Sequence, residues 1–81
     1  MKREMLIDEI VDFCTNYRII RKSPVELKQM KSNIDKNLYD APFVERLYNE
    51  IFIKAKHRKV LNEKGVRALL MELENIRLDL E

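Results

Sequence analysis

Apolar side chains recur along most of the chain at steps of three and four residues, the spacing that places them on one face of an α-helix. The first such stripe runs from Leu6 to Ile20, and three later segments repeat the pattern. No segment alternates between polar and apolar residues as a half-buried strand does. The pattern therefore predicts a single all-α domain over residues 1–81, with helices at about residues 3–20, 24–39, 42–58 and 63–80. Helices joined by such short connections bury their stripes together in a compact, mostly antiparallel four-helix bundle.

The expected starts of the later helices carry capping signals. Residues 23–26 read Ser-Pro-Val-Glu, which combines an N-cap serine, a proline in the first helical position and a glutamate placed to close a capping box. Asp40 is expected to cap the third helix and Asn62 the fourth. Leu61, just before Asn62, is expected to pack on Val66 as a hydrophobic staple.

Composition narrows the class of protein. Eighty-one residues suffice for one domain, and a net charge of +2 does not favour a protein that neutralises many phosphates of a nucleic acid. The one cysteine, Cys14, cannot form an intramolecular disulfide, which favours a reducing cytoplasmic location. The N-terminal apolar run is cut short by Asp8, and no apolar stretch is long enough for a membrane span, so we expect neither a signal peptide nor a transmembrane helix.

The residues that could perform chemistry are few. Nucleophilic catalysis would have to use Cys14 with His57, which are far apart in the sequence, and one cysteine with one histidine cannot make a structural zinc site. We therefore expect no catalytic residues, no cofactor and no metal. Cys14 lies on an apolar stripe and is expected in the core, as are the methionines Met5, Met30 and Met71.

The strongest charge feature is a basic cluster at the end of the third helix, formed by Lys54, Lys56, His57, Arg58 and Lys59. Such a cluster can contact phosphates, an anionic membrane surface or an acidic partner, or it can simply complement the negative end of the helix dipole. DNA binding through the fourth helix is disfavoured, because that segment carries more acidic than basic residues.

The second half of the chain also carries a pattern of apolar and aromatic spacings. A proline near the start of the third helix precedes a pair of apolar residues, then a leucine and tyrosine pair and a late alanine. A basic turn and a leucine-rich fourth helix follow. With these features, residues 41–76 resemble the C-terminal half of the immunity proteins for class IIa (pediocin-like) bacteriocins, the enterocin A immunity family, while residues 1–40 are similar to that family only in layout. The residues that carry the resemblance are Pro42, Phe43, Val44, Leu47, Tyr48, Ala55, Leu61, Leu69, Leu70 and Leu73, with residues 56–59 as the basic turn.

The resemblance implies an antiparallel four-helix bundle that protects the cell producing the bacteriocin. It implies binding, from the cytosolic side, to the membrane components of the mannose phosphotransferase permease with their bound bacteriocin, so that the lethal pore is blocked without covalent chemistry. We expect a monomer with possible peripheral membrane association. The family usually continues past the fourth helix into a tail that helps determine which bacteriocin is recognised, whereas this chain stops at Glu81, so the cognate bacteriocin is left open.

Candidate partner contacts follow from position. They are the basic cluster together with the outward-facing residues of the fourth helix, namely Lys64, Arg67, Glu74 and Arg77. The alternative function is a small helical antitoxin or transcriptional regulator that acts by binding protein or DNA. A regulator would dimerise and bind its operator in a salt-dependent manner. A small helical bundle with another partner is a third reading.

Overall fold

The computed structural model describes residues 1–17 and 23–81, and within those ranges the chain forms helices and no strands. The helices are α1 (Arg3–Asn16), α2 (Pro24–Asn37), α3 (Ala41–His57) and α4 (Lys64–Leu80). The prediction of an all-α four-helix bundle is confirmed. The helices begin within one residue of their predicted positions. Residues 18–20, which the sequence pattern assigned to the end of the first helix, lie outside the described residues.

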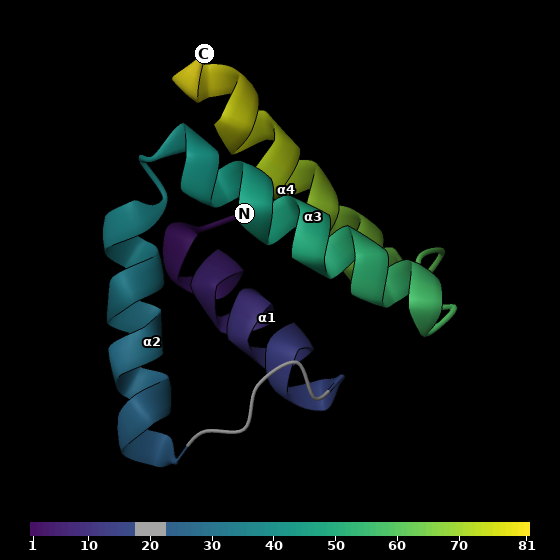
Figure 1. The fold of residues 1–81 in the computed structure, drawn as a ribbon, viewed down its shortest axis with the longest axis horizontal. Helices are drawn as coiled ribbons and strands as arrows, with labels where there is room; N and C mark the ends of the chain where they lie inside the picture. Colours follow the sequence, from purple (N-terminus) through teal and green to yellow (C-terminus); the bar gives the residue numbers. More distant parts are fainter. Residues whose placement is uncertain (18–22) are drawn as a thin grey trace.

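The helices follow one another in alternating directions (Figure 1). Helices α3 and α4 lie side by side as an antiparallel hairpin, and α1 runs beneath them and contacts α4. Helix α2 stands at the edge of the molecule and packs principally on α1. The hairpin is therefore the most extensively paired part of the fold, and α1 links it to α2.

The core is formed by apolar side chains from all four helices, but the shares are unequal. Six come from α1, four each from α3 and α4, and α2 contributes Ile34 alone, with Leu38 at its C-terminal cap. The predicted stripes of the first, third and fourth helices are confirmed over the described residues, and so is the core position of Cys14. The buried residues are Leu6, Ile7, Ile10, Val11, Phe13, Cys14, Ile34, Leu38, Val44, Leu47, Ile51, Ala55, Val66, Leu69, Leu70 and Leu73.

The prediction that the methionines fill the core is wrong for two of them. Met5 is 53% exposed and Met71 is 63% exposed, while Met30 is half-buried against the core. Each exposed methionine is sequence-adjacent to a buried leucine, and one residue is about 100° of rotation around a helix. Both side chains are thereby turned away from the buried stripe toward solvent.

The capping predictions succeed for α2 and fail for α4. The Glu26 amide donates to Ser23 Oγ at 3.3 Å and the Ser23 amide donates to Glu26 Oε1 at 3.2 Å, which completes the capping box. Asp40 occupies the N-cap of α3, but its side chain makes no capping hydrogen bond. Asn62 is not a cap, because α4 begins one residue later with Glu63 at its N-cap. With Glu63 as the N-cap, Leu61 and Val66 no longer occupy the two positions that define a hydrophobic staple, one before the N-cap and one four residues after it.

The turn from α3 into α4 has a Schellman geometry. The Lys59 amide donates to the Lys56 carbonyl at 3.2 Å, and the Val60 amide donates to the Ala55 carbonyl at 2.9 Å. Lys59 itself adopts a left-handed conformation with φ of 60°. Glycine is the usual residue here because a Cβ disfavours positive φ. A lysine therefore holds a strained position inside the basic cluster.

Candidate partner-binding surface on the α3–α4 hairpin

A groove runs along the outer face of the hairpin, between α3 and α4. One hollow of about 470 Å³ lies near the connecting turn, and a second of about 240 Å³ lies nearer the other end. The two hollows share Tyr48 and Glu74, so we treat them as one surface and name it the α3–α4 groove. Its lining residues are Glu45, Tyr48, Asn49, Leu61, Asn62, Arg67, Leu70, Met71, Glu74 and Arg77.

The middle of the groove is apolar and aromatic. The rings of Tyr48 and Phe52 stack with their centroids 6.1 Å apart, and both rings are half-buried against the core. Met71 lies on the opposite wall and is largely exposed. A half-buried aromatic pair beside an exposed methionine offers a partner an apolar surface that can adapt in shape.

The end of the groove near the C-terminus is held by ion pairs within α4. Arg77 contacts both oxygens of Glu74, with its Nε 3.3 Å from Oε2, and its Nη1 is 3.0 Å from Glu81 Oε1. The hydrogen bond from Arg77 lowers the pKa of Glu74, and the pairing raises the pKa of Arg77. Two of the predicted contact residues, Glu74 and Arg77, are thus already engaged with each other and shape this end of the groove.

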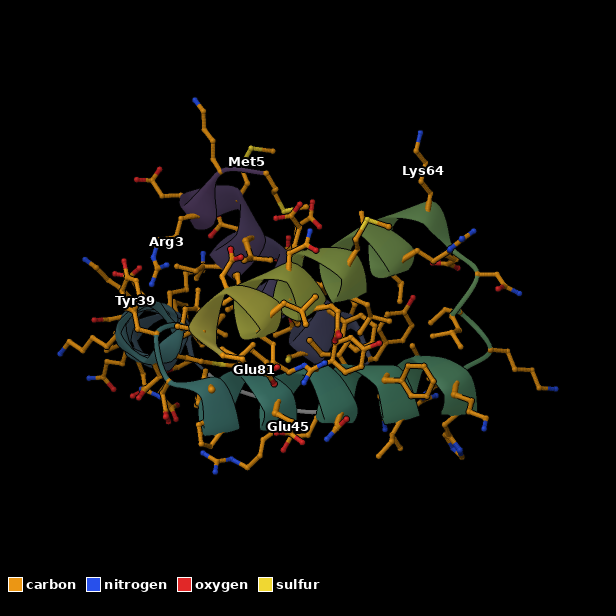
Figure 2. All side chains as sticks on the ribbon, turned by 90° about the horizontal axis from the view of Figure 1, so that it is seen from above. Arg3, Met5, Tyr39, Glu45, Lys64 and Glu81 are labelled. Atoms are coloured by element: carbon orange, nitrogen blue, oxygen red, sulfur yellow. The ribbon has the colours of Figure 1, made fainter. Side chains whose placement is uncertain are left out.

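The other end of the hairpin is basic. The short turn after α3 brings Lys64 and Arg67 to the same end of the molecule as the basic cluster of residues 54–59. Apart from Lys54, which is half-buried, all of these side chains are exposed. Within the described parts of the chain, no carboxylate lies in ion-pair distance of any of them. The structure therefore gathers seven of the nine predicted contact residues at one end of the hairpin, and Figure 2 shows Lys64 there, away from Glu45 and Glu81.

Sequence reasoning missed the apolar part of the groove, namely Tyr48, Leu70 and Met71 with Glu45 and Asn49 beside them. The apolar spacing places Tyr48 and Leu70 on the buried stripes of the third and fourth helices; Leu70 is indeed buried, whereas Tyr48 is only half-buried. The available signal was the width of the stripes, since Phe52 and Met71 extend them toward one side of each helix. The sequence does not show that the widened stripe of α3 and that of α4 lie on the same face of the hairpin, because this depends on how the two helices pack together.

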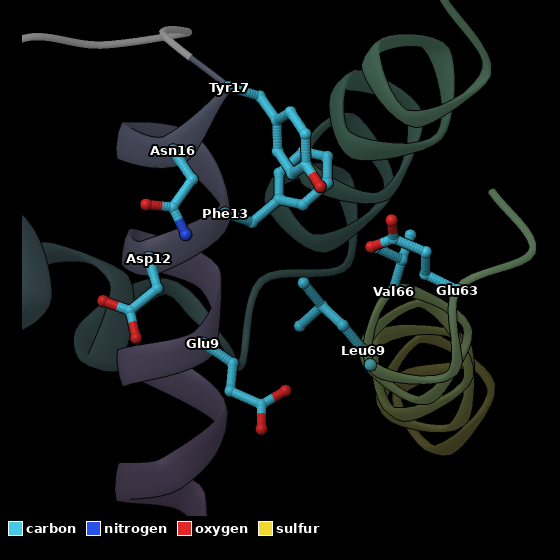
Figure 3. Close-up of a pocket in the computed structure, with 9 residues that line it drawn as sticks. Glu9, Asp12, Phe13, Asn16, Tyr17, Glu63, Val66 and Leu69 are labelled. Atoms are coloured by element: carbon cyan, nitrogen blue, oxygen red, sulfur yellow. The ribbon is translucent and has the colours of Figure 1, made fainter. Parts of the chain in front are cut away.

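Apart from the groove, a separate hollow of about 210 Å³ lies between α1 and the start of α4. Figure 3 shows Phe13 and Tyr17 facing Val66 and Leu69 across it. The two aromatic rings are 4.7 Å apart and tilted. Three carboxylates line the same hollow, namely Glu9, Asp12 and Glu63. None of these residues was predicted to form a site.

Another hollow, of about 410 Å³, lies between α1 and α2. Two ion pairs span it, Arg3 to Asp35 at 2.6 Å and Lys31 to Asp8 at 2.9 Å. Because these side chains are a third or more exposed, each pair contributes at most about 1 kcal/mol. These exposed ion pairs therefore add little to the contact between α1 and α2.

The residues that could perform chemistry are not assembled. Cys14 is buried, and desolvation, with a smaller effect from Glu50, raises the pKa of its thiol to about 11. It is therefore a protonated thiol at neutral pH, whereas nucleophilic attack needs the thiolate. His57 is exposed at the last position of α3. Residues 1–17 and 23–81 also contain no group of three His, Cys, Asp or Glu side chains arranged to hold a metal ion.

None of the helices in the described ranges combines the length and the apolar character needed to cross a bilayer. Comparison with protein-family models, with curated proteins and with solved structures yields no match.

Proposed function

We propose that this protein is a bacteriocin immunity protein of the class IIa (pediocin-like) type, which acts by binding and not by catalysis. The observation that carries the proposal is the position of residues 41–76, the segment with the family resemblance. This segment spans α3, the connecting turn and most of α4, and it bears both the α3–α4 groove and the unpaired basic end. The segment that resembles the family thus also carries the predicted basic cluster and all of the groove lining except Arg77.

The mode of action that fits this surface is docking at the cytosolic side of a membrane protein. The exposed cations at the end of the hairpin are attracted to an anionic leaflet or to an acidic cytoplasmic loop. The apolar middle of the groove then accepts side chains of the permease when bacteriocin is bound. Protection would follow because the bound bundle holds the receptor and bacteriocin in a closed assembly.

The direct test is expression in a bacteriocin-sensitive strain, followed by inhibitory concentrations for a panel of class IIa bacteriocins. We expect resistance to one or a few members of the panel. Unchanged sensitivity to the whole panel, with the folded protein present in the cells, would contradict the proposal. The antitoxin or regulator alternative would then be tested by salt-dependent binding to DNA or by capture of a toxin.

The basic end can be tested separately with Lys56→Glu and Arg58→Glu combined. Reversing two exposed charges should weaken attraction to an anionic surface, so we expect a several-fold loss of protection with unchanged helical circular dichroism. The matched control is Lys28→Glu with Lys36→Glu, which makes the same charge change on the exposed side of α2. Equal loss in both variants would show that net charge alone matters and that the basic end is not a contact surface.

Arg67→Glu tests the groove. Arg67 is exposed on the groove wall and has no ion pair within the described residues, so its reversal leaves the fold intact. Arg77→Glu is a less specific change, because it also removes the bonds to Glu74 and Glu81. Full protection by Arg67→Glu would exclude this wall of the groove from the contact.

A further inference from the structure

The α3–α4 hairpin is electrically polarised along its length. The end that contains the turn, residues 54–67, carries six basic residues and one acidic residue, a net charge of +5. The opposite end, formed by residues 40–50 and 72–81, carries seven acidic and two basic residues, a net charge of −5. We name these ends the basic pole and the acidic pole. They come together only because α3 and α4 are antiparallel, so the sequence read along the chain does not show them.

Helix stability does not explain this arrangement. In α3 the basic residues Lys54 and Lys56 lie in the last turn, where the helix dipole favours positive charge. In α4 the order is reversed, since Lys64 and Arg67 lie in its first turns and Asp79 and Glu81 at its end. These α4 charges therefore oppose the helix dipole, and each group lies at the same end of the hairpin as charges of like sign on α3. Glu63 at the N-cap and Arg77 in the last turn do follow the dipole, but the remaining terminal charges of α4 break this local stability rule, as residues at functional sites often do.

The poles also border the α3–α4 groove. On α3, Glu45 lies at the acidic end of the groove. On α4, Arg67 lines the basic end, while Glu74 and Arg77, which are paired with each other, line the acidic end. The apolar middle, with Tyr48 and Met71, lies between them. Along one face, the order is thus basic, apolar, acidic.

We propose that a second copy of this chain docks on the α3–α4 groove in an antiparallel, two-fold arrangement. A two-fold axis near Tyr48 and Met71 places the basic pole of each copy on the acidic pole of the other, and apolar residues meet apolar residues at the centre. An isologous contact needs a surface that is complementary to itself when rotated by a half turn, and equal and opposite poles around an apolar centre satisfy that requirement. This proposal rests on the hairpin alone and not on the immunity function, and it differs from the monomer expected from the sequence. Because the second copy covers the groove that is proposed to accept the permease, the dimer has to dissociate before that contact forms.

The size of the face predicts a weak dimer. A helix of 17 residues is about 25 Å long, and two such helices side by side present a face about 20 Å wide. The resulting contact of about 500 Å² per copy is smaller than the roughly 800 Å² of a standard interface. The dimer should therefore form reversibly at high protein concentration. Because exposed charges contribute much of the attraction, it should weaken as salt screens them.

The first measurement is the molar mass of the unmodified protein by sedimentation equilibrium, from about 10 µM to about 1 mM, concentrations chosen for a weak, small interface. At low salt we expect the mass to rise from the monomer value of 9.8 kDa toward twice that value. In 1 M NaCl, where the Debye length falls to about 3 Å, we expect at least a tenfold weaker association. A monomer at every concentration in low salt, or a dimer that salt does not weaken, would overturn the proposal.

Charge exchange tests the arrangement itself. One variant carries Lys56→Glu with Arg67→Glu and lowers the basic pole from +5 to +1, while the other carries Glu45→Lys with Glu81→Lys and raises the acidic pole from −5 to −1, so that one pole of each variant is nearly neutral. The first should associate only weakly with itself, because its nearly neutral pole no longer attracts the acidic pole of another copy. The second should associate weakly with itself, and an equimolar mixture of the two should form mixed dimers. Glu81→Lys removes the Arg77 bond to Glu81, but the Glu74 and Arg77 contact, whose two residues line the groove, is left in place in both variants.

The matched control is the α2 variant, Lys28→Glu with Lys36→Glu, which changes the net charge as much as the first variant but leaves both poles intact. It should dimerise like the unmodified protein. A control variant that becomes monomeric to the same degree, or a mixture of the two charge variants that stays monomeric, would overturn the antiparallel arrangement. Since no bacteriocin enters these measurements, their failure is distinguishable from a failure of the immunity proposal.

Discussion

Helix α2 and the α3–α4 hairpin obtain their stability from different sources. Helix α2 has the best local signals in the described chain, with a complete capping box and a proline in its first turn, yet Ile34 is its single buried residue. Helices α3 and α4 lack side-chain caps, and the turn between them strains Lys59, yet each buries four apolar residues. Local sequence signals therefore mark where a helix begins, whereas the apolar stripes decide how strongly it is held.

The largest expected difference between the two regions is in the cost of removing an apolar side chain. Leu73→Ala in α4 removes a fully buried side chain and should lower the free energy of unfolding by about 3 to 5 kcal/mol. Leu27→Ala in α2 removes a half-buried one and should cost about 1 kcal/mol. Urea unfolding of both variants measures the contrast. Similar losses would mean that α2 is as well integrated as the hairpin.

The same contrast explains how much of this molecule could be predicted from its sequence. Helix number, approximate bounds and most of the core follow from stripe spacing, because burying one helical face dominates the free energy of a small bundle. The cap at Asn62 was wrong because residues 60–63 form a further turn, in which the Glu63 amide donates to the Val60 carbonyl at 3.0 Å, and α4 starts only after Glu63. The preference of a residue type for the N-cap position does not show where the turn before the helix ends.

The candidate site was predictable only in part. The basic cluster was evident because its residues are contiguous in sequence. The groove and the acidic pole were not, since Glu45 and Glu81 lie thirty-six positions apart in the chain and meet only through the antiparallel packing of two helices. The outward position of Met71 was missed for a related reason, because a methionine is compatible with both core and surface.

A smaller and more local effect is expected from the cap of α2. Ser23→Ala removes both the hydroxyl acceptor for the Glu26 amide and its bond to the Glu26 carboxylate, and should cost about 1 kcal/mol. Because α2 packs principally on α1, we expect faster amide hydrogen exchange throughout α2 and little change in α3 and α4. Asp40→Ala is the matched control, since the Asp40 side chain makes no cap bond. Equal acceleration of exchange in the hairpin would show that α2 and the hairpin open together.

The smallest expected effect is a gain in stability at the strained end of the hairpin. Lys59→Gly relieves a positive φ that a Cβ disfavours, and should raise the free energy of unfolding by about 1 kcal/mol, which for a domain of this size raises the Tm by roughly 4 to 8 °C. Lys59→Ala removes the same charge but keeps the Cβ, so it should give little of this gain and separates backbone strain from charge repulsion. If both variants stabilise the protein equally, the native protein loses stability at this position through charge repulsion within the basic pole and not through backbone strain. Either gain would mean that the native chain gives up stability where its cations are most concentrated, as expected if those cations serve a contact.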